Sequence, residues 1–389
     1  MRVVGMISGT SFDAIELAAA DLSSRGDALE LVPLGSMGVE YEPDVRRAIG
    51  AALPPAAAGA EALCRLDAAL GRAFAAAAKR AVDELCDGGA DLVVSHGQTI
   101  FHWVQDGRAR GTLQLGQPAW IAEATGLPVV SDLRSRDIAL GGQGAPLVSL
   151  FDALLLGTDG PEVRAALNLG GIANLTVLAP GREPLAYDAG SANALIDAAV
   201  GHVSGGAEAF DRDGRRAARG RVDAEVLAAL LDDPYYALPA PKSTGKEHFH
   251  LPYLLSHAAG RTAGDDLVAT ATALAAETVA RECRAHGVEE LIAAGGGTRN
   301  PTLMSMLRER APGVRVTTSD ALGVPAQAKE AYAFALLGWL TWHGLPGTLP
   351  SCTGAAAPAV LGSLTPGREP LALPPSPAPP TRLRIRSGP

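Results

Sequence analysis

The chain has 389 residues, which is more than one ordinary hydrophobic core accommodates and therefore predicts two domains. Hydrophobic residues make up 47% and charged residues 19%, a composition typical of a soluble globular protein. The net charge of −9 argues against nucleic acid or an anionic membrane as a partner, so an anionic substrate needs a local site of backbone N–H groups, Lys or Arg.

The cysteines and the first residues bear on the compartment. The four cysteines lie far apart and form no CxxC spacing: Cys64, Cys86, Cys283 and Cys352. This pattern argues against a disulfide framework and favours a reducing cytosol. Gly5 and Gly9 break the N-terminal apolar run, which does not fit a signal peptide, and the Ala-rich segment 68–82 is too short and too charged to span a bilayer. We therefore expect a cytoplasmic protein.

The chain starts with a hairpin rather than with a strand followed by a helix. Residues 1–22 are expected to form a strand, a Gly-Thr-Ser turn and a second strand, and residues 29–41 extend this pattern. Helices are expected at 43–53, 61–87 and 118–126, the last closed by Gly126. Strands are expected at 90–99, where the strand ends in a polar loop, at 111–116 and at 127–132.

The second half repeats this opening. Residues 164–180 predict strand, glycine turn and strand, and residues 184–200 predict strand, small-residue turn and helix. Residues 289–310 predict strand, triple-glycine turn and helix, and long helices are expected at 264–286 and 325–340. The Pro-rich segment from Pro370 onward is expected to be a surface extension or disordered. Two halves that open alike indicate an internal duplication and an α/β fold with two domains.

Three glycine turns each follow an apolar strand. They are Ser8-Gly9-Thr10-Ser11, Gly170-Gly171 and Gly295-Gly296-Gly297. Glycine lets backbone N–H groups converge on an anion, and small hydroxyls add donors, so together these turns favour the binding of nucleotide phosphates. For each turn alone, an ordinary strand-end turn is the alternative. None matches GxxxxGK[ST] or GxGxxG, so neither a P-loop nor a dinucleotide-binding domain is supported.

Polar side chains gather in "SHGQTIFH" at 95–102. His96, Gln98 and Thr99 suit hydrogen bonding to a polyhydroxylated ligand. A histidine satisfied by nearby backbone is the alternative, and no spacing here demands zinc. Glu330 lies in the first turns of the final helix, where an acid on an otherwise apolar helix usually faces solvent.

Two further loops are rich in polar side chains. Residues 132–148 place Arg134, Arg136 and Asp137 in a glycine-broken stretch between apolar segments. Such a stretch favours a binding loop, with a salt-bridged linker as the alternative. "PKSTGKEHFH" at 241–250 is either a lid or a solvated loop, and the sequence favours neither.

"YDAGSANALID", residues 187–197, surrounds one carboxylate with small residues. Tyr187 is expected in a strand and Asp188 exposed at its tip, followed by a small-residue turn and a helix. Either a tight turn needs this space or something large approaches the carboxylate closely.

In their order and spacing, these segments resemble one known family. The motifs that carry the resemblance run from about residue 3 to residue 365: "GMISGTSFDAIE", "SHGQTIFH", "LQLGQPAWIAEATGLPVVSDLRSRDIALGGQGAPLV", "NLGGIANLT", "YDAGSANALID", "PKSTGKEHFH", "GGGTRNPTLM" and "LPSCTGAAAPAVLG". They are similar to those of the anhydro-N-acetylmuramic acid kinases, which belong to the actin-like/hexokinase superfamily. The resemblance implies an α/β fold with two ribonuclease-H-like domains flanking a central cleft. We expect an N-terminal domain at 1–132, a C-terminal domain with the nucleotide and catalytic motifs at 133–369, and a Pro-rich tail at 370–389.

The resemblance also implies an ATP-dependent step of cell-wall recycling. The family opens the 1,6-anhydro ring of anhydro-N-acetylmuramic acid with water and phosphorylates the freed 6-oxygen, which gives N-acetylmuramic acid 6-phosphate and ADP. Mg²⁺ is expected to bridge the phosphates, and because it takes few protein ligands we assign it none. The expected partner is a small-molecule anhydrosugar, with neither nucleic acid nor a membrane; a homodimer is left open.

The resemblance assigns roles residue by residue. Asp188 matches the catalytic acid, and we hypothesise that it deprotonates the attacking water while the γ-phosphoryl group captures the leaving 6-oxygen. The expected ATP-binding residues are Gly9, Thr10, Ser11, Phe12, Asp13, Ala14, Ile15, Glu16, Gly170, Gly171, Asn174, Gly190, Asn193, Gly295, Gly296 and Gly297. The expected substrate-binding residues combine the cluster at His96 with three positions that the family has near the sugar: His96, Gln98, Thr99, Arg136, Asp137 and Glu330.

The sequence departs from the family pattern at several positions. Ala14 stands where Gly is usual, Glu16 where Asp is usual, and Gln327 where an acid is common. "DAGSAN" replaces Asp-Thr-Gly-Pro-Gly-Asn, and Ala192 would strain this turn if the position required a positive φ.

Two alternative functions remain open at this point. One is a kinase of the same superfamily that acts on another anhydrosugar such as levoglucosan. The other is a nucleotide-binding protein without catalysis, such as an actin-like filament former. ADP release with and without an anhydrosugar distinguishes them.

Overall fold

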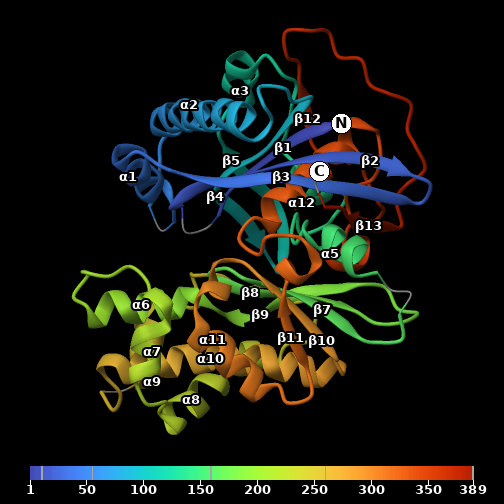
Figure 1. The fold of residues 1–389 in the computed structure, drawn as a ribbon. Helices are drawn as coiled ribbons and strands as arrows, with labels where there is room; N and C mark the ends of the chain where they lie inside the picture. The colour runs from blue at the N-terminus through green and yellow to red at the C-terminus, as the bar shows by residue number, and fades with distance from the viewer. Residues whose placement is uncertain (10–11, 55, 158–159, 259, 388–389) are drawn as a thin grey trace. The chain divides into compact units, whose positions relative to one another are not determined.

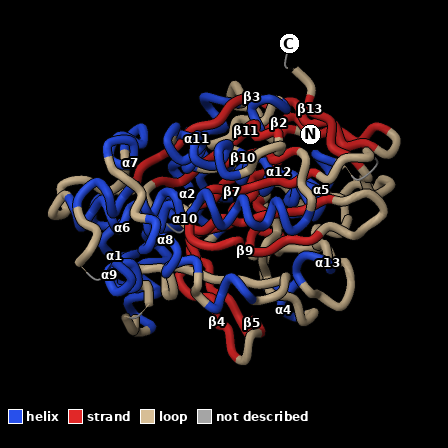
Figure 2. Tube along the Cα trace, turned by 90° about the horizontal axis from the view of Figure 1, so that it is seen from below, coloured by secondary structure: helices blue, strands red, loops and turns tan. Residues whose placement is uncertain are grey.

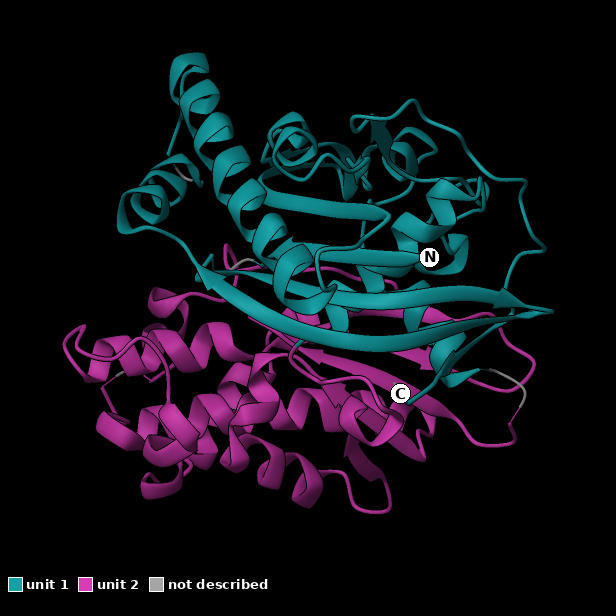
Figure 3. Ribbon diagram, turned by 45° about the horizontal axis from the view of Figure 1, so that its top comes forward, with its two compact units in different colours: residues 1–157, 328–389 teal, residues 158–327 magenta. Residues whose placement is uncertain are grey.

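The computed structural model describes residues 1–9, 12–54, 56–157, 160–258 and 260–387. The chain divides into two compact units: unit 1 comprises residues 1–157 and 328–389, and unit 2 comprises residues 158–327 (Figure 3). Each unit is built around its own β-sheet. Within the described ranges, no helix has the length and apolar character needed to cross a bilayer.

The sheet of unit 1 begins with the expected hairpin. Its strands are β1 (Arg2–Ser8), β2 (Ala14–Arg25), β3 (Ala28–Glu40), β4 (Leu92–Gln105), β5 (Arg108–Leu115), β6 (Val129–Ser131), β12 (Ser363–Thr365) and β13 (Arg382–Ile385) (Figure 1). They follow the order β12-β6-β4-β1-β2-β3-β13, and β5 pairs with β4. Strands β1, β2 and β3 are antiparallel neighbours, whereas β4 runs parallel to β1 and β6 parallel to β4.

The sheet of unit 2 repeats the central order of unit 1. Its strands are β7 (Arg164–Leu169), β8 (Ile172–Leu178), β9 (Leu185–Ser191), β10 (Glu290–Ala294) and β11 (Arg315–Thr318), in the order β11-β10-β7-β8-β9. Again the first three strands are antiparallel, and the next two continue the sheet in parallel from the first. The same relation holds for β6-β4-β1-β2-β3. This shared topology confirms the duplication and the α/β fold of two ribonuclease-H-like units.

Helices cover both sheets. In unit 1 they are α1 (Pro43–Ala52), α2 (Ala60–Leu85), α3 (Pro118–Thr125), α4 (Ser135–Ala139), α5 (Ser149–Leu156), α12 (Lys329–Trp342) and α13 (Pro350–Thr353). In unit 2 they are α6 (Asn193–Val203), α7 (Arg215–Arg219), α8 (Ala224–Leu231), α9 (Leu251–Ala258), α10 (Gly264–His286) and α11 (Pro301–Arg310). Short 3₁₀ turns complete unit 2: η1 (Arg212–Gly214), η2 (Pro234–Ala237), η3 (Gly296–Arg299) and η4 (Ser319–Leu322).

Strand β1 is buried on both faces because helices pack on both. Val4 and Met6 share a core cluster with Phe74 of α2. Side chains alternate along a strand, so Gly5 faces the other way, toward α12. A Cβ on Gly5 would lie 2.1 Å from the carbonyl oxygen of Ala331, far inside van der Waals contact. The helix therefore approaches the sheet backbone as closely as only glycine permits.

The core of unit 2 lies between its sheet and α10. Leu167 and Leu169 of β7 are fully buried and cluster with Ala271 and Leu274 of α10. Most of this helix is buried, since its Ala and Thr side chains are small enough to let neighbouring elements pack close to it. Helix α10 thus supports strand β9, which carries Asp188.

The two units differ from the expected domains at 1–132 and 133–369. Residues 133–157 belong to unit 1, where the buried ion pair between Lys329 and Asp152 ties α5 to α12 at 2.7 Å. Residues 328–369 return to the same unit because α12 packs on β1. The sequence shows the two halves but contains no signal that its last helix returns to the first.

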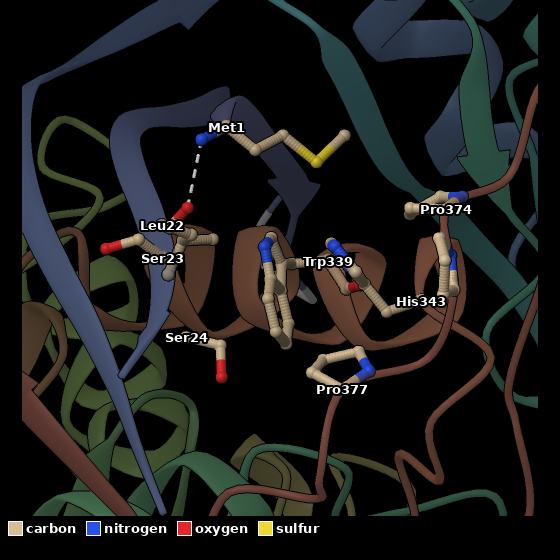
Figure 4. A pocket seen from close by; sticks show the side chains of 9 residues that line it. Met1, Leu22, Ser23, Ser24, Trp339, His343, Pro374 and Pro377 are labelled. Atoms are coloured by element: carbon tan, nitrogen blue, oxygen red, sulfur yellow. Dashed lines mark hydrogen bonds between the residues drawn. The ribbon is translucent and has the colours of Figure 1, made fainter. Parts of the chain in front are cut away.

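The Pro-rich tail is a surface segment that ends in a strand. Most of residues 371–380 are exposed, as expected, but Arg382–Ile385 then pairs in parallel with β3 as β13. The tail borders a cavity of about 290 Å³ (Figure 4). Trp339 of α12 and His343, the residue after its end, line it, and their ring centroids lie 3.9 Å apart. The expectation of disorder is therefore wrong for the end of the tail.

Strand β4 is longer than expected. It continues through "TIFHWVQ" to Gln105, where a polar loop was expected, because β-branched and aromatic residues pair with β5 as a ribbon. Figure 2 shows the ribbon extending from its sheet. On one face of it, Phe101 is 48% exposed, Trp103 47% and Leu113 38%.

Candidate active site

Asp188 lies inside strand β9 and not at an exposed tip, so that expectation was wrong. The strand continues to Ser191 because β8 pairs along it, and a bulge in the pairing places Asn174 opposite Asp188. Gly190 has φ 148°, and a Cβ there would lie 2.8 Å from Cε1 of Tyr236. The small residues after Asp188 therefore serve close packing within unit 2.

The Asp188 carboxylate accepts one hydrogen bond on each oxygen. The Asn174 side-chain amide donates to Oδ1 at 3.0 Å, and the Thr244 backbone N–H donates to Oδ2 at 3.0 Å. Burial raises the pKa of Asp188 above its ordinary value; the two donors lower the pKa in part, and the Glu247 carboxylate raises it further. The net result is a carboxylate that takes up a proton more readily than an exposed aspartate, as a general base must.

The segment 241–250 packs against Asp188. Its Lys242 carbonyl oxygen accepts the Asp188 N–H at 2.9 Å. The Lys242 ammonium pairs with Glu282 at 3.1 Å, and its side chain is only 4% exposed. The solvated-loop alternative is therefore wrong for this part of the segment, which forms one wall of the site.

The glycine turn at 295–297 is shaped for close approach. Gly295 has φ 88°, and a Cβ there would lie 2.6 Å from Oδ1 of Asn168. A Cβ on Gly297 would lie 2.7 Å from Cβ of Leu169, whereas one on Gly296 would meet nothing within 4 Å. Asn168 Oδ1 is buried and, among the described residues, accepts no hydrogen bond. Open backbone beside an unused acceptor fits a ligand that brings its own donor.

The turn at Gly170 and Gly171 is held by the start of α6. Gly171 O accepts from the Ala192 N–H at 2.9 Å, and Gly170 O accepts from the Asn193 N–H at 3.1 Å. The Asn193 amide also donates to Leu169 O at 3.0 Å and to Gly170 O at 2.8 Å. Ala192 has φ −116°, so "DAGSAN" contains none of the strain that a positive φ at this residue would bring.

Unit 1 contains the other expected ATP-side segment. Two of its residues lie outside the described ones: Thr10 and Ser11. Around them, the Phe12 N–H donates to Gly9 O at 3.1 Å, and Asp13 pairs with Arg46 at 2.5 Å. Residues 14–16 already belong to β2, with Ile15 buried and both Ala14 and Glu16 more exposed. The two expected strands that flank this segment are therefore present as β1 and β2.

His96 is satisfied within the protein. Its Nε2 accepts from Arg134 Nε–H at 2.7 Å, and its Nδ1 donates to Gly97 O at 3.0 Å. Burial and the Arg134 charge lower the pKa of His96 to about 3. His96 is therefore a neutral support for Arg134, which agrees with the alternative of a histidine bonded within the protein.

Gln98 and Thr99 form a short polar chain with β1. The Ser8 hydroxyl donates to Gln98 Oε1 at 2.5 Å, and the Gln98 amide donates to Thr99 O at 3.1 Å. The Thr99 hydroxyl accepts from Gln114 at 3.1 Å. A side-chain hydrogen bond thus joins the end of β1, before the first glycine turn, to β4, which carries the candidate sugar-binding residues.

Arg136 and Asp137 face opposite environments. Arg136 is exposed, whereas Asp137 is fully buried. The Gly144 N–H and the Thr353 hydroxyl each donate to the Asp137 carboxylate at 2.7 Å. Asp137 therefore fastens its own glycine-rich loop to α13, and both carboxylate oxygens are already bonded.

Arg134 is a candidate site residue that the expected substrate-binding residues do not include. It lies beside His96 and carries a guanidinium whose pKa burial lowers to about 10, with the Glu330 carboxylate acting to raise it. His96 and Glu330, expected at the sugar, are thus brought together around Arg134. "DLRSR" offers two arginines two residues apart, and only their burial in the fold distinguishes them.

The described residues contain no group of three or more His, Cys, Asp or Glu side chains placed to hold a metal ion. Mg²⁺ that enters on nucleotide phosphates keeps most of its water and needs only one or two carboxylates.

Comparison with known proteins identifies the family. A family model described as anhydro-N-acetylmuramic acid kinase matches residues 1–367. The chain belongs to this family. A relative from Streptomyces coelicolor named anhydro-N-acetylmuramic acid kinase is 62% identical over 392 aligned residues, which cover 100% of both chains. One of the same name from Rhodococcus erythropolis is 55% identical over 94% of both chains. Among solved structures, a ROK family glucokinase from Streptomyces griseus with glucose and AMPPNP covers 86% of this chain and 98% of its own, with a TM-score of 0.37 and 15% identity.

Within the anhydro-N-acetylmuramic acid kinase family, the departure at Gln327 has a local explanation. Its amide donates to Gly295 O at 3.0 Å and to the Thr298 hydroxyl at 2.8 Å. The Thr298 hydroxyl in turn donates to Gly295 O at 2.8 Å. A carboxylate at this position could not donate these two bonds. In this chain Gln327 therefore stabilises the glycine turn at 295–297.

Proposed function

We propose that this protein is an ATP-dependent kinase that opens the 1,6-anhydro ring of anhydro-N-acetylmuramic acid with water and phosphorylates the 6-oxygen, in peptidoglycan recycling. The observation that carries the proposal is the environment of Asp188. A hydrolytic ring opening needs a base for water, and the pKa of this buried carboxylate is raised. Close relatives bear the kinase name over the full chain.

The proposed reaction uses Asp188 as its one base. The water oxygen forms a bond to the anomeric carbon as Asp188 removes a water proton, and the bond from that carbon to the 6-oxygen breaks. The 6-oxygen bonds to the γ-phosphorus, whose bond to the β–γ bridging oxygen breaks to release ADP. A glycosidase needs a second carboxylic acid for the leaving oxygen, whereas here the phosphoryl group takes that role.

ATP is proposed to rest on the glycine turns. The open backbone at Gly296 and the unused acceptor Asn168 Oδ1 suit the nucleoside, whose ribose hydroxyls are donors. Gly9 and residues 12–16 are proposed to hold phosphates on unit 1. Mg²⁺ would neutralise charge on the phosphates when bound. Asn174 and Asn193 are better assigned to supporting Asp188 and the Gly170 turn, from the bonds they make.

Sugar recognition is proposed for the polar group around Arg134. The muramic substrate carries a lactyl carboxylate, and a guanidinium is the side chain best suited to bind one. Glu330 and Thr99 are proposed to offer further polar atoms for hydroxyl and amide groups. Gln98, bonded to Ser8 and to Thr99 O, is assigned to supporting this strand. Arg136 is exposed and Asp137 already bonded, so we assign them to the loop that holds Arg134.

The proposal is tested by ADP release from the purified protein with ATP and Mg²⁺. Anhydro-N-acetylmuramic acid, levoglucosan, N-acetylmuramic acid and no sugar are compared. Turnover with the first alone supports both substrate and coupled hydrolysis. Turnover with levoglucosan alone would move the substrate, and none above the no-sugar rate would overturn the proposal. We place this ATP-consuming reaction in the cytoplasm; sedimentation equilibrium tests the homodimer.

A further inference from the structure

Glu282 of α10 binds two side chains at once. Its Oε2 accepts the Tyr187 hydroxyl at 3.0 Å, and its Oε1 pairs with the Lys242 ammonium at 3.1 Å. These partners come from different elements, strand β9 and the segment 241–250. One carboxylate on the helix below therefore joins the strand to the segment.

Both partners of Glu282 adjoin Asp188. Tyr187 is its neighbour on β9, and the Lys242 carbonyl oxygen accepts the Asp188 N–H at 2.9 Å. Two residues after Lys242, the Thr244 N–H donates to Asp188 Oδ2 at 3.0 Å. Glu282 therefore anchors both strand β9, which carries Asp188, and the segment whose Thr244 N–H binds the Asp188 carboxylate.

The Lys242 ammonium would be poorly hydrated if Glu282 were lost. Its side chain is 4% exposed and lies over the rings of Tyr187 and Tyr235, 5.9 and 5.2 Å from their centroids. Among the residues that the structure describes, its other oxygen partner is Tyr236 O at 3.3 Å. A buried charge without its counter-ion is costly, so the segment would move to expose the lysine.

We propose that Glu282 is a positioning residue for Asp188: by fixing Tyr187 and Lys242 it holds the Thr244 N–H on the catalytic carboxylate. The inference rests on the proposed function only in treating Asp188 as the base. Glu282 itself contacts neither Asp188 side-chain oxygen. It acts through the segment 242–244, which is why its effect should appear in the proton affinity of Asp188.

The direction of that effect follows from the groups that face Asp188. Thr244 N–H and Asn174 lower the pKa of Asp188, while burial and Glu247 raise it. Tyr235 from η2 donates its hydroxyl to Asp188 O at 2.6 Å, and Lys242 lies beside Tyr235. Losing the Thr244 donor while Asp188 stays buried removes a stabilising bond to the charged form, so we expect the pKa of Asp188 to rise.

Helix α10 offers a matched control. Glu277 has the same 17% side-chain exposure as Glu282 and pairs with Arg284 at 2.7 Å and Arg310 at 3.2 Å. Among the described residues its partners are arginines outside both β9 and the segment 241–250. Replacing it removes ion pairs from the same helix without touching the proposed connection.

The test compares Glu282→Gln, Tyr187→Phe and Glu277→Gln in the full-length protein. For Glu282→Gln we expect kcat to fall about 10- to 100-fold with little change in either KM, and the acid limb of kcat to move to higher pH. Tyr187→Phe, which keeps the ring and one partner of Glu282, should shift the limb less in the same direction. Glu277→Gln should leave the limb in place. An unmoved limb in both Glu282→Gln and Tyr187→Phe would overturn the inference.

A second readout separates this inference from the proposed function. Carbon-13 NMR of protein with labelled aspartate carboxyls reports the Asp188 titration directly, assigned by its loss in Asp188→Asn. We expect the Asp188 midpoint to rise in Glu282→Gln and to stay in Glu277→Gln. If the wild type shows no anhydrosugar-dependent turnover, the proposed function fails, and this titration still decides whether Glu282 positions Asp188.

Discussion

Arg134 donates its Nε–H to Nε2 of His96 across 2.7 Å, so His96 must be neutral to receive the bond. Its proton then sits on Nδ1, which donates to Gly97 O at 3.0 Å. The ring also packs on Phe334, with the ring centroids 4.8 Å apart. This pairing fixes a cation inside unit 1 and removes His96 from titration near neutrality, because burial and the guanidinium lower its pKa to about 3.

His96 should make the folded state sensitive to acid. The folded pKa of His96, about 3, lies below its ordinary value of 6.5, so the unfolded state takes up the proton first as the pH falls. The contribution is fully present above about pH 6.5 and is lost progressively toward pH 3, at about 1.4 kcal/mol per pH unit. Urea unfolding between about pH 7 and pH 5 measures this slope. His96→Gln keeps an acceptor for Arg134 without titrating, so its slope should be smaller; equal slopes would contradict the assignment.

Asp188→Asn should abolish the base and keep the fold. The asparagine can still accept the Thr244 N–H, but it cannot take a proton from water. We expect turnover with the anhydrosugar to fall by about 10²- to 10⁴-fold, while ATP affinity measured by calorimetry stays within about threefold. In the wild type, the raised pKa of Asp188 places the acid limb of kcat above the range of an exposed aspartate. Retained turnover in the variant would remove Asp188 as the base.

Much of the fold could be predicted from sequence because its signals are local. The hairpin at β1–β2, the long helices α10 and α12 and the αL glycine that closes α3 all follow from nearby residues. The return of α12 to unit 1 and the pairing of β13 with β3 could not, since both depend on contacts hundreds of residues apart.

The candidate site was predictable in its residue types more than in its bonds. The small residues around Asp188 and the family resemblance predict a role for it, yet its Thr244 donor is a backbone N–H that no side chain in the sequence reveals. The sequence alone does not distinguish Arg134 from Arg136; they differ in how far the fold buries each side chain. Asn174 was expected to bind ATP, whereas the bulge in the β8–β9 pairing places it opposite Asp188, to which its amide donates.

Gly5→Ala should destabilise unit 1 severely. The new Cβ would lie 2.1 Å from Ala331 O and 2.6 Å from Ala335 N, both backbone atoms that cannot rotate away. Overpacking of this kind costs about 1–3 kcal/mol or more. Gly50→Ala is the matched control, because it lies in α1 where a Cβ meets nothing within 4 Å. Helix propensity should make that variant about 1 kcal/mol more stable. Thermal unfolding distinguishes the two, and similar midpoints would show that α12 can move off β1.

Gln327→Glu tests whether this chain depends on its departure from the family pattern. The substitution removes the amide donor to Gly295 O and to Thr298 Oγ1, and it points a carboxylate oxygen at a carbonyl oxygen. The loss of these bonds should cost about 1–3 kcal/mol at the turn, which predicts a several-fold higher KM for ATP with a smaller change in the sugar KM. Thr298→Ala provides the second arm, since its hydroxyl links the same groups. If Gln327 and Thr298 hold one turn together, the double variant should lose less than the sum of the two single losses. Full additivity, or a KM for ATP that Gln327→Glu leaves unchanged, would separate Gln327 from the nucleotide turn.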